Sequence, residues 1–320
     1  MFDQLSKLQN NLRSNRKVRI AFSTIRLVIF TITLFLIVRY FLTNVARFYA
    51  FPTINFFLVS LFFIMLILIQ IIYSLFWKIF VDGFGRKISF RNAFFSTYYP
   101  VLTKYLPGKG WFQLDRIYAL KKFGIEPSTG LTINILEQII VIYTGLLVSM
   151  PLFFKIVHPL YVVLILVTAT ILMFYLLLHQ DSFAKMITRV GRFFKMSKSV
   201  IFTYKIRPKT IFLFIFLYTT NWILWGLIFK LSISILDETN SLSIGMSTGA
   251  FSFSSILGFI IPVAPAGLGI REGALLVFLE KQVNPAALFN ATIGIRLCTI
   301  IGEVLMFLIA LCLKARMKID

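Results

Sequence analysis

Two short stretches combine helix-breaking residues with cationic side chains in an otherwise apolar chain. The first, "KYLPGKGW", covers residues 104–111, and the second, "PVAPAGLGIREG", covers residues 262–273. Proline removes a backbone donor and clashes with the preceding turn, and glycine permits a sharp chain reversal. Both stretches are therefore predicted to interrupt helices. The residues that would make these structural breaks are Pro107, Gly108, Pro265, Gly267 and Gly269.

Positive side chains accompany each predicted break. The helix after the first break should start near Trp111 and carry Arg116, and the helix after the second should start near Leu268 and carry Arg271. The free N–H groups and the dipole at a helix N-terminus attract anions. The pattern predicts a site for a phosphate or another anion. Two lysines add positive charge at the first break: Lys104 and Lys109.

Three more charged residues lie inside apolar segments: Glu137, Arg296 and Glu303. Charges inside a membrane are costly and are functional hypotheses by default. The plainer interpretation is a structural ion pair that locks helix packing, for example Arg296 with Glu303 or Glu137 with Arg271. The predicted substrate-binding residues are Lys109, Trp111, Arg116, Glu137, Arg271, Glu272, Arg296 and Glu303.

No catalytic, metal-binding or cofactor-binding arrangement is predicted. The two histidines are isolated, the two cysteines share the last apolar segment, and no serine–histidine–aspartate set has a plausible geometry. "GLGIREG" follows an apolar segment rather than a strand, so it is not interpreted as a nucleotide-binding loop.

The composition is that of a helical membrane protein. Hydrophobic residues make up 58% of the 320 residues, against about 45–50% in soluble domains. Lipid offers no hydrogen-bond partner to backbone N–H and C=O groups, so the fold class is expected to be all-α. We predict about seven or eight spans with one or two re-entrant broken-helix hairpins. The apolar segments are 20–42, 54–80, 131–154, 159–179, 210–233, 243–262 and 286–313, with shorter ones at 92–106 and 271–281.

Basic loops set the predicted orientation. The net charge is +21, and lysine and arginine cluster between the apolar segments. The positive-inside rule then puts both termini in the cytoplasm. Segment 92–123 becomes a hairpin from the cytoplasmic side, whereas 243–283 is either a hairpin or two crossings. The chain is expected to be one membrane domain, with a basic N-terminus at 1–19, halves at 20–179 and 210–320, and a basic loop at 180–209.

Three motifs carry a family resemblance. "YLPGKGW" followed by Arg116, "ILEQ" with Glu137, and "PAGLGIREG" together resemble the transmembrane, flippase-like domain of lysylphosphatidylglycerol synthetases over about residues 15–315. In those synthetases a soluble domain makes an aminoacylated lipid, and the membrane domain is associated with moving it across the bilayer. The chain stops at Asp320, so the resemblance implies a stand-alone membrane domain of the cytoplasmic membrane without lysyl transfer.

The leading functional prediction is a translocase for a phosphate-bearing lipid, whether a phospholipid, an aminoacyl-lipid or a polyprenyl-phosphate-linked lipid. The alternative is a non-transporting accessory protein for a separate glycosyl- or aminoacyl-transferase. A third hypothesis, an intramembrane enzyme with Glu272 or Glu137 as general base, lacks a visible nucleophile. The expected partner is an anionic membrane lipid rather than nucleic acid, because the basic loops suit the anionic inner leaflet. An oligomer is compatible with the sequence.

Overall fold

The computed structural model describes residues 55–105, 110–179, 208–261, 265–267 and 269–316. Within these ranges the chain forms ten α-helices, two short 3-10 helices and no strand, which confirms the all-α prediction for that part of the chain. The elements are α3 (Phe56–Gly83), α4 (Phe90–Tyr98), η2 (Val101–Tyr105), α5 (Gly110–Lys121), α6 (Pro127–Val148), α7 (Met150–Ile156), α8 (Pro159–Leu178), α10 (Pro208–Leu236), α11 (Ile244–Ile260), η3 (Pro265–Gly267), α12 (Ile270–Leu279) and α13 (Pro285–Arg316).

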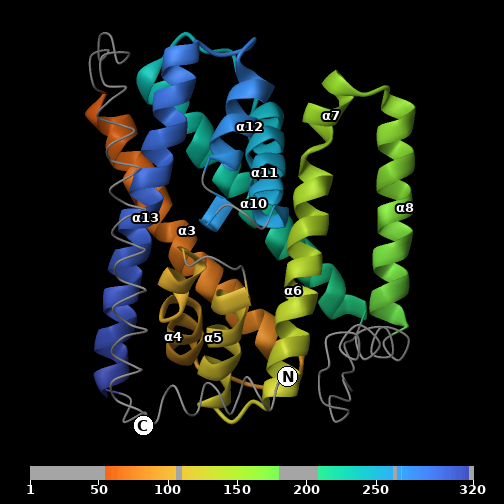
Figure 1. Cartoon of the computed structure of the whole chain (residues 1–320), viewed down its shortest axis with the longest axis vertical. Coiled ribbons are helices and arrows are strands. Elements are labelled where there is room, and N and C mark those ends of the chain that lie inside the picture. Colours follow the sequence, from red (N-terminus) through yellow and green to blue (C-terminus); the bar gives the residue numbers. More distant parts are fainter. Residues whose placement is uncertain (1–54, 106–109, 180–207, 262–264, 268, 317–320) are drawn as a thin grey trace.

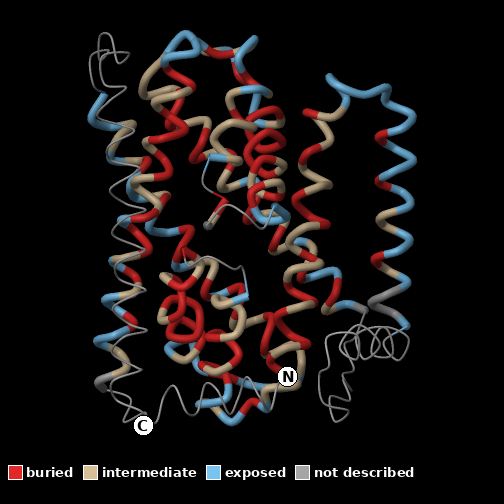
Figure 2. Tube along the Cα trace, in the orientation of Figure 1, coloured by how far each residue is buried: buried red, intermediate tan, exposed pale blue. Residues whose placement is uncertain are grey.

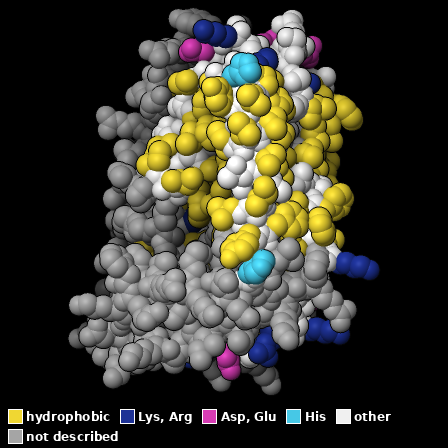
Figure 3. All heavy atoms as spheres, turned by 90° about the vertical axis from the view of Figure 1, so that its right-hand side faces the viewer, with side chains coloured by type: hydrophobic (Ala, Val, Ile, Leu, Met, Phe, Trp, Pro, Cys, Tyr) yellow, Lys and Arg dark blue, Asp and Glu magenta, His cyan; other side chains and the backbone are white. Residues whose placement is uncertain are grey.

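The chain is a multi-pass membrane protein. Four described helices, α3, α6, α10 and α13, are long and apolar enough to cross a bilayer, and α8 and α11 contain shorter apolar stretches. These six helices coincide with six of the predicted segments, whereas 20–42 lies outside the described residues. Large apolar side chains point outward, as Ile165 and Ile301 do with 65% and 66% exposure. Figure 3 shows such side chains covering the face formed by α8.

Helix α10 lies at the centre of the bundle. It packs against α3, α6, α11 and α13, whereas α8 contacts α6 and α7 at the periphery (Figure 1). Buried residues follow the same arrangement and gather along the central helices, while much of α8 is exposed (Figure 2). A helix that exposes apolar residues on its outer side is expected where lipid, not water, is the solvent.

One predicted segment is divided in two. The sequence predicted a single apolar segment over 131–154, but α6 ends at Val148 and α7 begins at Met150. Pro151, in the first turn of α7, cannot continue the preceding helix. The Ser149 hydroxyl donates to the carbonyl oxygen of Gly145 at 2.6 Å. This hydrogen bond satisfies one of the last backbone carbonyl groups of α6, which have no partner within the helix.

Two helical hairpins fill the bundle from opposite ends. In the first, α4 and η2 lead into residues 106–109, which lie outside the described part, and α5 returns beside α4. In the second, α11 runs inward and α12 returns beside it. Of the two arrangements left open for 243–283, the structure has the hairpin. The two hairpins meet near mid-height of the bundle, where η2 contacts η3 (Figure 1).

Glycine permits the reversal of the second hairpin. Gly267 and Gly269 have φ angles of 73° and 82°, in the left-handed region. A Cβ atom on Gly267 would lie 2.8 Å from the Cα atom of Gly258 in α11, so the two chain segments approach too closely for any side chain. Ala266 also has a positive φ, of 50°. Helix α12 then starts at Ile270, two residues after the predicted start near Leu268.

Candidate functional site

The structure divides the predicted site residues between two charge clusters. Arg116 and Glu137 lie in the first, which we call the buried pair. The second, the tip cluster, lies where the hairpins meet and comprises Lys104, Arg271, Glu272, Arg296 and Glu303. Trp111 is half-buried at the start of α5. The remaining predicted residues of the first break lie outside the described residues: Pro107, Gly108 and Lys109.

The buried pair is fully enclosed by protein. The Arg116 guanidinium pairs with the Glu137 carboxylate, and both side chains have 0% exposure. Its Nη2 atom lies 3.2 Å from Glu137 Oε1. The hydroxyl groups of Tyr73 and Tyr218 donate to the same oxygen at 3.1 and 2.7 Å. Four elements, α3, α5, α6 and α10, therefore converge on one carboxylate.

An aromatic ring completes the enclosure of Arg116. Its guanidinium carbon lies 3.5 Å from the centroid of the Trp77 ring, a cation–π geometry. Trp77 in turn donates its indole N–H to the Ser96 hydroxyl at 2.9 Å. An external anion would have to displace Glu137 to reach Arg116. The arrangement is that of an ion pair that holds helices together.

The predicted pairing of Glu137 with Arg271 was wrong. Helices α5 and α6 pack against each other directly, and this brings Arg116 to Glu137, whereas Arg271 belongs to the other hairpin. Sequence reasoning missed Tyr73, Trp77 and Tyr218. A tyrosine or tryptophan inside an apolar segment could have indicated these residues, because a buried phenol or indole needs a hydrogen-bond partner.

In the tip cluster, Glu303 ties the first hairpin to α13. Lys104 on η2 forms an ion pair with the Glu303 carboxylate. The adjacent Tyr105 hydroxyl donates to the other carboxylate oxygen at 2.9 Å. Tyr105 was not predicted from the sequence. Both contacts reach a helix about 200 residues later in the chain, so one carboxylate fastens η2 to α13.

Arg296 ties the second hairpin to the same helix. It lies seven residues before Glu303, on the same side of α13. Its Nη2 atom donates to the carbonyl oxygen of Ala266 at 2.7 Å, and its Nε atom lies 3.7 Å from Glu272 Oε1. The predicted pairing of Arg296 with Glu303 was wrong. Helix α12 brings Glu272 to Arg296, and η2 brings Lys104 to Glu303.

Glu272 also closes the N-terminus of α12. Its Oε2 atom accepts a hydrogen bond from the backbone N–H of Gly269 at 2.7 Å, the contact of a capping box. The positive end of this half-helix is thus partly neutralised by the protein's own carboxylate. The N-terminus of α12 was predicted to receive an external anion, but Glu272 already lies there.

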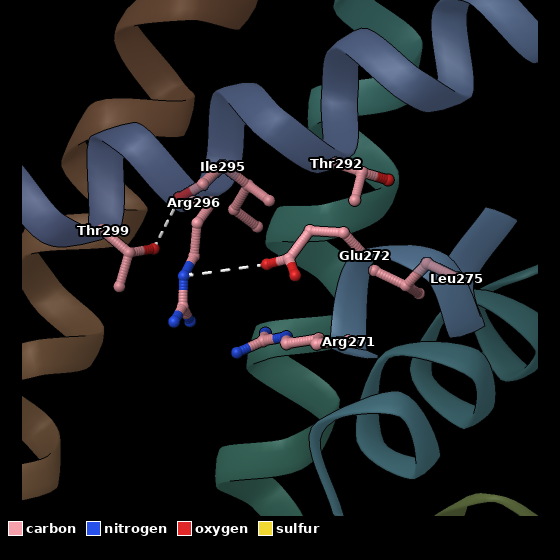
Figure 4. A pocket seen from close by; sticks show the side chains of 7 residues that line it. All are labelled: Arg271, Glu272, Leu275, Thr292, Ile295, Arg296 and Thr299. Carbon is pink, nitrogen blue, oxygen red and sulfur yellow. Dashed lines mark hydrogen bonds and ion pairs between the residues drawn. The ribbon is translucent and has the colours of Figure 1, made fainter. Parts of the chain in front are cut away.

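Arg271 is the cation of the tip cluster that lacks an anionic partner among the described residues. Its guanidinium carbon lies 4.1 Å from the centroid of the Phe251 ring, and no described side chain forms an ion pair with it. It borders a small pocket (Figure 4), lined by Arg271, Glu272, Leu275, Thr292, Ile295, Arg296 and Thr299.

The pocket brings two guanidinium groups together. Figure 4 shows Arg271 and Arg296 extending toward the same space, while the carboxylate of Glu272 is directed at Arg296. Thr292, which also lines the pocket, is 2% exposed, and its hydroxyl has no hydrogen-bond partner in the described part of the chain. Like charges held together away from water are unfavourable. An anion in this pocket would lower that cost.

Comparison with protein families matches residues 20–306 to the lysylphosphatidylglycerol synthase TM region. The chain belongs to this family. The match confirms the resemblance inferred from the three motifs, and no curated protein matches the chain significantly. The part shared with the lysylphosphatidylglycerol synthase TM region includes both hairpins, the buried pair and every member of the tip cluster.

Proposed function

We propose that this member of the lysylphosphatidylglycerol synthase TM-region family binds the phosphate-bearing headgroup of a membrane lipid beside Arg271 and moves that lipid across the cytoplasmic membrane. The observation that carries the proposal is the guanidinium of Arg271, which forms no ion pair with any described residue and borders a pocket between the second hairpin and α13. A charge within membrane-spanning helices is costly unless it is paired or used. The other charges of the tip cluster have partners. Within the described part of the chain, no carboxylate pairs with Arg271, so we propose that it is available for a ligand.

The two clusters have different roles in this proposal. Arg271 holds the phosphate, and the already paired Arg296 and Lys104 strengthen the positive field around it. Lys109 and Trp111 belong to the first hairpin and remain candidates for contact with the headgroup. Arg116 and Glu137, which the sequence suggested as lipid ligands, hold the first hairpin in the bundle instead.

The proposed topology places the site at mid-depth in the bilayer. With both hairpins re-entrant, six segments cross the bilayer, namely the predicted segment 20–42 and the helices α3, α6, α8, α10 and α13. Both termini then lie in the cytoplasm, because the basic loops belong inside. The first hairpin then re-enters from the cytoplasm and the second from outside. Transporters commonly build midplane sites from such broken helices, and access alternates between the two sides. The lipid tails stay in the bilayer while the headgroup passes between the hairpin tips.

A binding and transport experiment tests the proposal. Protein purified in mild detergent would be analysed by native mass spectrometry with lipid extraction, for wild type and Arg271→Gln. A matched control is Lys281→Gln, which removes an exposed positive charge just after α12. Wild type and the control should retain an anionic lipid that Arg271→Gln loses. In liposomes, only wild type and the control should move a fluorescent phosphatidylglycerol between leaflets.

Two outcomes separate the proposal from its rivals. Equal lipid retention by wild type and Arg271→Gln, with both proteins folded, would place the anion site elsewhere. Arg271-dependent retention without movement between leaflets would favour the accessory role, in which the protein presents lipid to a separate glycosyl- or aminoacyl-transferase. Co-purification of such an enzyme would then identify the partner.

A further inference from the structure

We infer that Thr292 is a ligand-binding residue of the pocket beside Arg271, and that its hydroxyl donates a hydrogen bond to one non-bridging oxygen of the headgroup phosphate. The inference rests on the proposed function, because it concerns the same pocket and the same phosphate. It adds a residue that no sequence motif indicated, and it specifies how far the phosphate enters the pocket.

Thr292 places a buried hydroxyl at the pocket wall. The residue is 2% exposed, it lines the pocket, and its Oγ1 atom has no hydrogen-bond partner among the described residues. It lies four residues before Arg296 on α13, so the two side chains share a helix face. Figure 4 shows that Arg271 reaches the same pocket from α12. A buried hydroxyl without a partner is unfavourable, and a ligand oxygen in the pocket would supply the partner.

Two other threonines show what is particular to Thr292. Thr299 lines the same pocket, but its hydroxyl already donates to the carbonyl oxygen of Ile295 at 2.6 Å. Thr248 is 3% exposed, and its hydroxyl also lacks a partner in the described ranges. It packs against Gly226 of α10, however, and does not line this pocket. Of these three threonines, Thr292 alone combines an unused donor with a cavity.

The pocket admits one oxygen-sized group. Its volume is about 10 Å³, close to the minimum that holds a single water molecule. The apolar side chains of Leu275 and Ile295, which are 1% and 4% exposed, form part of the wall. A whole phosphate is larger than this space. One of its oxygens can therefore enter, while the phosphorus atom and the other substituents stay outside.

The polar groups around this space suit a phosphate oxygen. An ionised phosphate oxygen accepts hydrogen bonds and donates none. Arg271 and Thr292 offer N–H and O–H donors, and the Nε atom of Arg296 also lacks a hydrogen bond within the described residues. Glu272 is the acidic residue on the wall, but its two oxygens lie 2.7 Å from the Gly269 nitrogen and 3.7 Å from Arg296 Nε. Donors are thus available to the ligand, and hydrogen bonds to an anion are stronger than neutral ones.

Binding measurements on the purified full chain test the inference. The lipid probe is dihexanoyl phosphatidylglycerol. The second probe is inorganic phosphate, which offers the same kind of oxygen without glycerol or acyl chains. Calorimetry would measure the binding of both probes to wild type, Thr292→Val and Thr292→Ser. Thr248→Val is the matched control, because it removes a similarly buried, unpartnered hydroxyl that does not line the pocket.

Thr292→Val should weaken the binding of both probes about tenfold or more, because a hydrogen bond to a charged group is lost. Thr292→Ser keeps the hydroxyl and should retain most of the affinity. Thr248→Val should bind both probes as wild type does. Inorganic phosphate should bind wild type at least about tenfold more weakly than the lipid, because it lacks the apolar chains.

The outcomes distinguish failure of the inference from failure of the proposed function. Equal lipid affinity of Thr292→Val and wild type, with binding still lost in Arg271→Gln, would overturn the inference alone and leave water as the group that fills the pocket. Equal affinity of wild type for lipid and inorganic phosphate, both weakened in Thr292→Val, would support the hydrogen bond and overturn the lipid substrate. Failure of folded wild type to bind either probe would overturn both.

A stability measurement separates binding from folding. Without lipid, Thr292→Val should unfold at the same temperature as wild type or a higher one, because its hydroxyl has no partner to lose within the described residues. A lowered unfolding midpoint would reveal a structural hydrogen bond at Thr292 and overturn the inference.

A test on wild type alone keeps the inference falsifiable if Thr292→Val does not fold. Replacing one of the two non-bridging oxygens of the lipid phosphate by sulfur gives two diastereomers. Sulfur is larger than oxygen and a weaker acceptor. The diastereomer that places sulfur in the pocket should bind about tenfold more weakly than the other. Equal binding of the two diastereomers would contradict the entry of a single oxygen.

Discussion

The guanidinium of Arg116 and the carboxylate of Glu137 form an ion pair in which neither side chain has exposed surface. Arg116 belongs to the first hairpin and Glu137 to α6, and the hydroxyl groups of Tyr73 and Tyr218 reach the same carboxylate from α3 and α10. One polar contact thus joins the hairpin to three long apolar helices. Such a contact is costly to break, because lipid and apolar side chains offer no substitute partner.

Removing one member of this pair should destabilise the protein severely. Glu137→Gln leaves the Arg116 charge buried without compensation, and we expect the free energy of unfolding to fall by about 3–5 kcal/mol. Unfolding by sodium dodecyl sulfate, followed by tryptophan fluorescence, measures this loss. The double variant Arg116→Met/Glu137→Leu should recover most of it, because the buried charges are then gone together.

The matched control for that experiment is Glu126→Gln. Glu126 is an exposed carboxylate immediately before α6, and its side chain makes no capping hydrogen bond. Its replacement should change the free energy of unfolding by no more than about 0.5 kcal/mol. Equal effects at Glu126 and Glu137 would contradict the structural role of the buried pair.

Alanine at Gly267 should disturb the second hairpin. The φ angle of 73° is unfavourable for alanine, and the new Cβ atom would lie 2.8 Å from the Cα atom of Gly258. We expect a loss of about 1–3 kcal/mol in stability and weaker lipid binding. Gly273→Ala is the control, because it lies within α12 with no atom within 4 Å of the added Cβ. A Gly273→Ala variant as unstable as Gly267→Ala would count against the close approach.

Arg296 should hold the tip of the second hairpin. Arg296→Met removes the hydrogen bond to the Ala266 carbonyl and leaves Glu272 without its cation. Amide hydrogen exchange over residues 265–273 should become about tenfold faster, since one lost hydrogen bond is worth about 1 kcal/mol or slightly more. Exchange over 101–105 should stay unchanged, because Lys104 and Tyr105 still bind Glu303. Unchanged exchange at 265–273 would show that Arg296 does not restrain the tip.

Cysteine labelling tests the proposed orientation. Glu238 and Lys87 are exposed in loops that follow α10 and α3, and these helix ends lie at opposite ends of the bundle (Figure 1). In a background with Cys298 and Cys312 changed to serine, Glu238→Cys should react with a membrane-impermeant maleimide in intact cells. Lys87→Cys should react only after permeabilisation. The reverse pattern would place the basic loops outside and invert the topology.

Apolar length predicted most of the helices correctly. Segments such as 210–233 and 286–313 correspond to α10 and α13, because a long apolar run in lipid has few alternatives to a helix. The same reasoning missed the break at Ser149. It also left a hairpin and two crossings open for 243–283, because the 17 residues of α11 look like a short crossing until α12 is seen beside them.

The sequence by itself determined the helical membrane fold, the residues that interrupt the helix in the second hairpin, and the family. These properties depend on composition and on local backbone chemistry, such as the positive φ angles of Gly267 and Gly269. Only the tertiary structure decided which charges meet. Spacing along a helix predicts that Arg296 and Glu303 share a face, but their partners come from whichever segments pack opposite. That packing depends on the shapes of many side chains at once, and it brought Glu272 to Arg296 and Lys104 to Glu303 while leaving Arg271 without an anionic partner among the described residues.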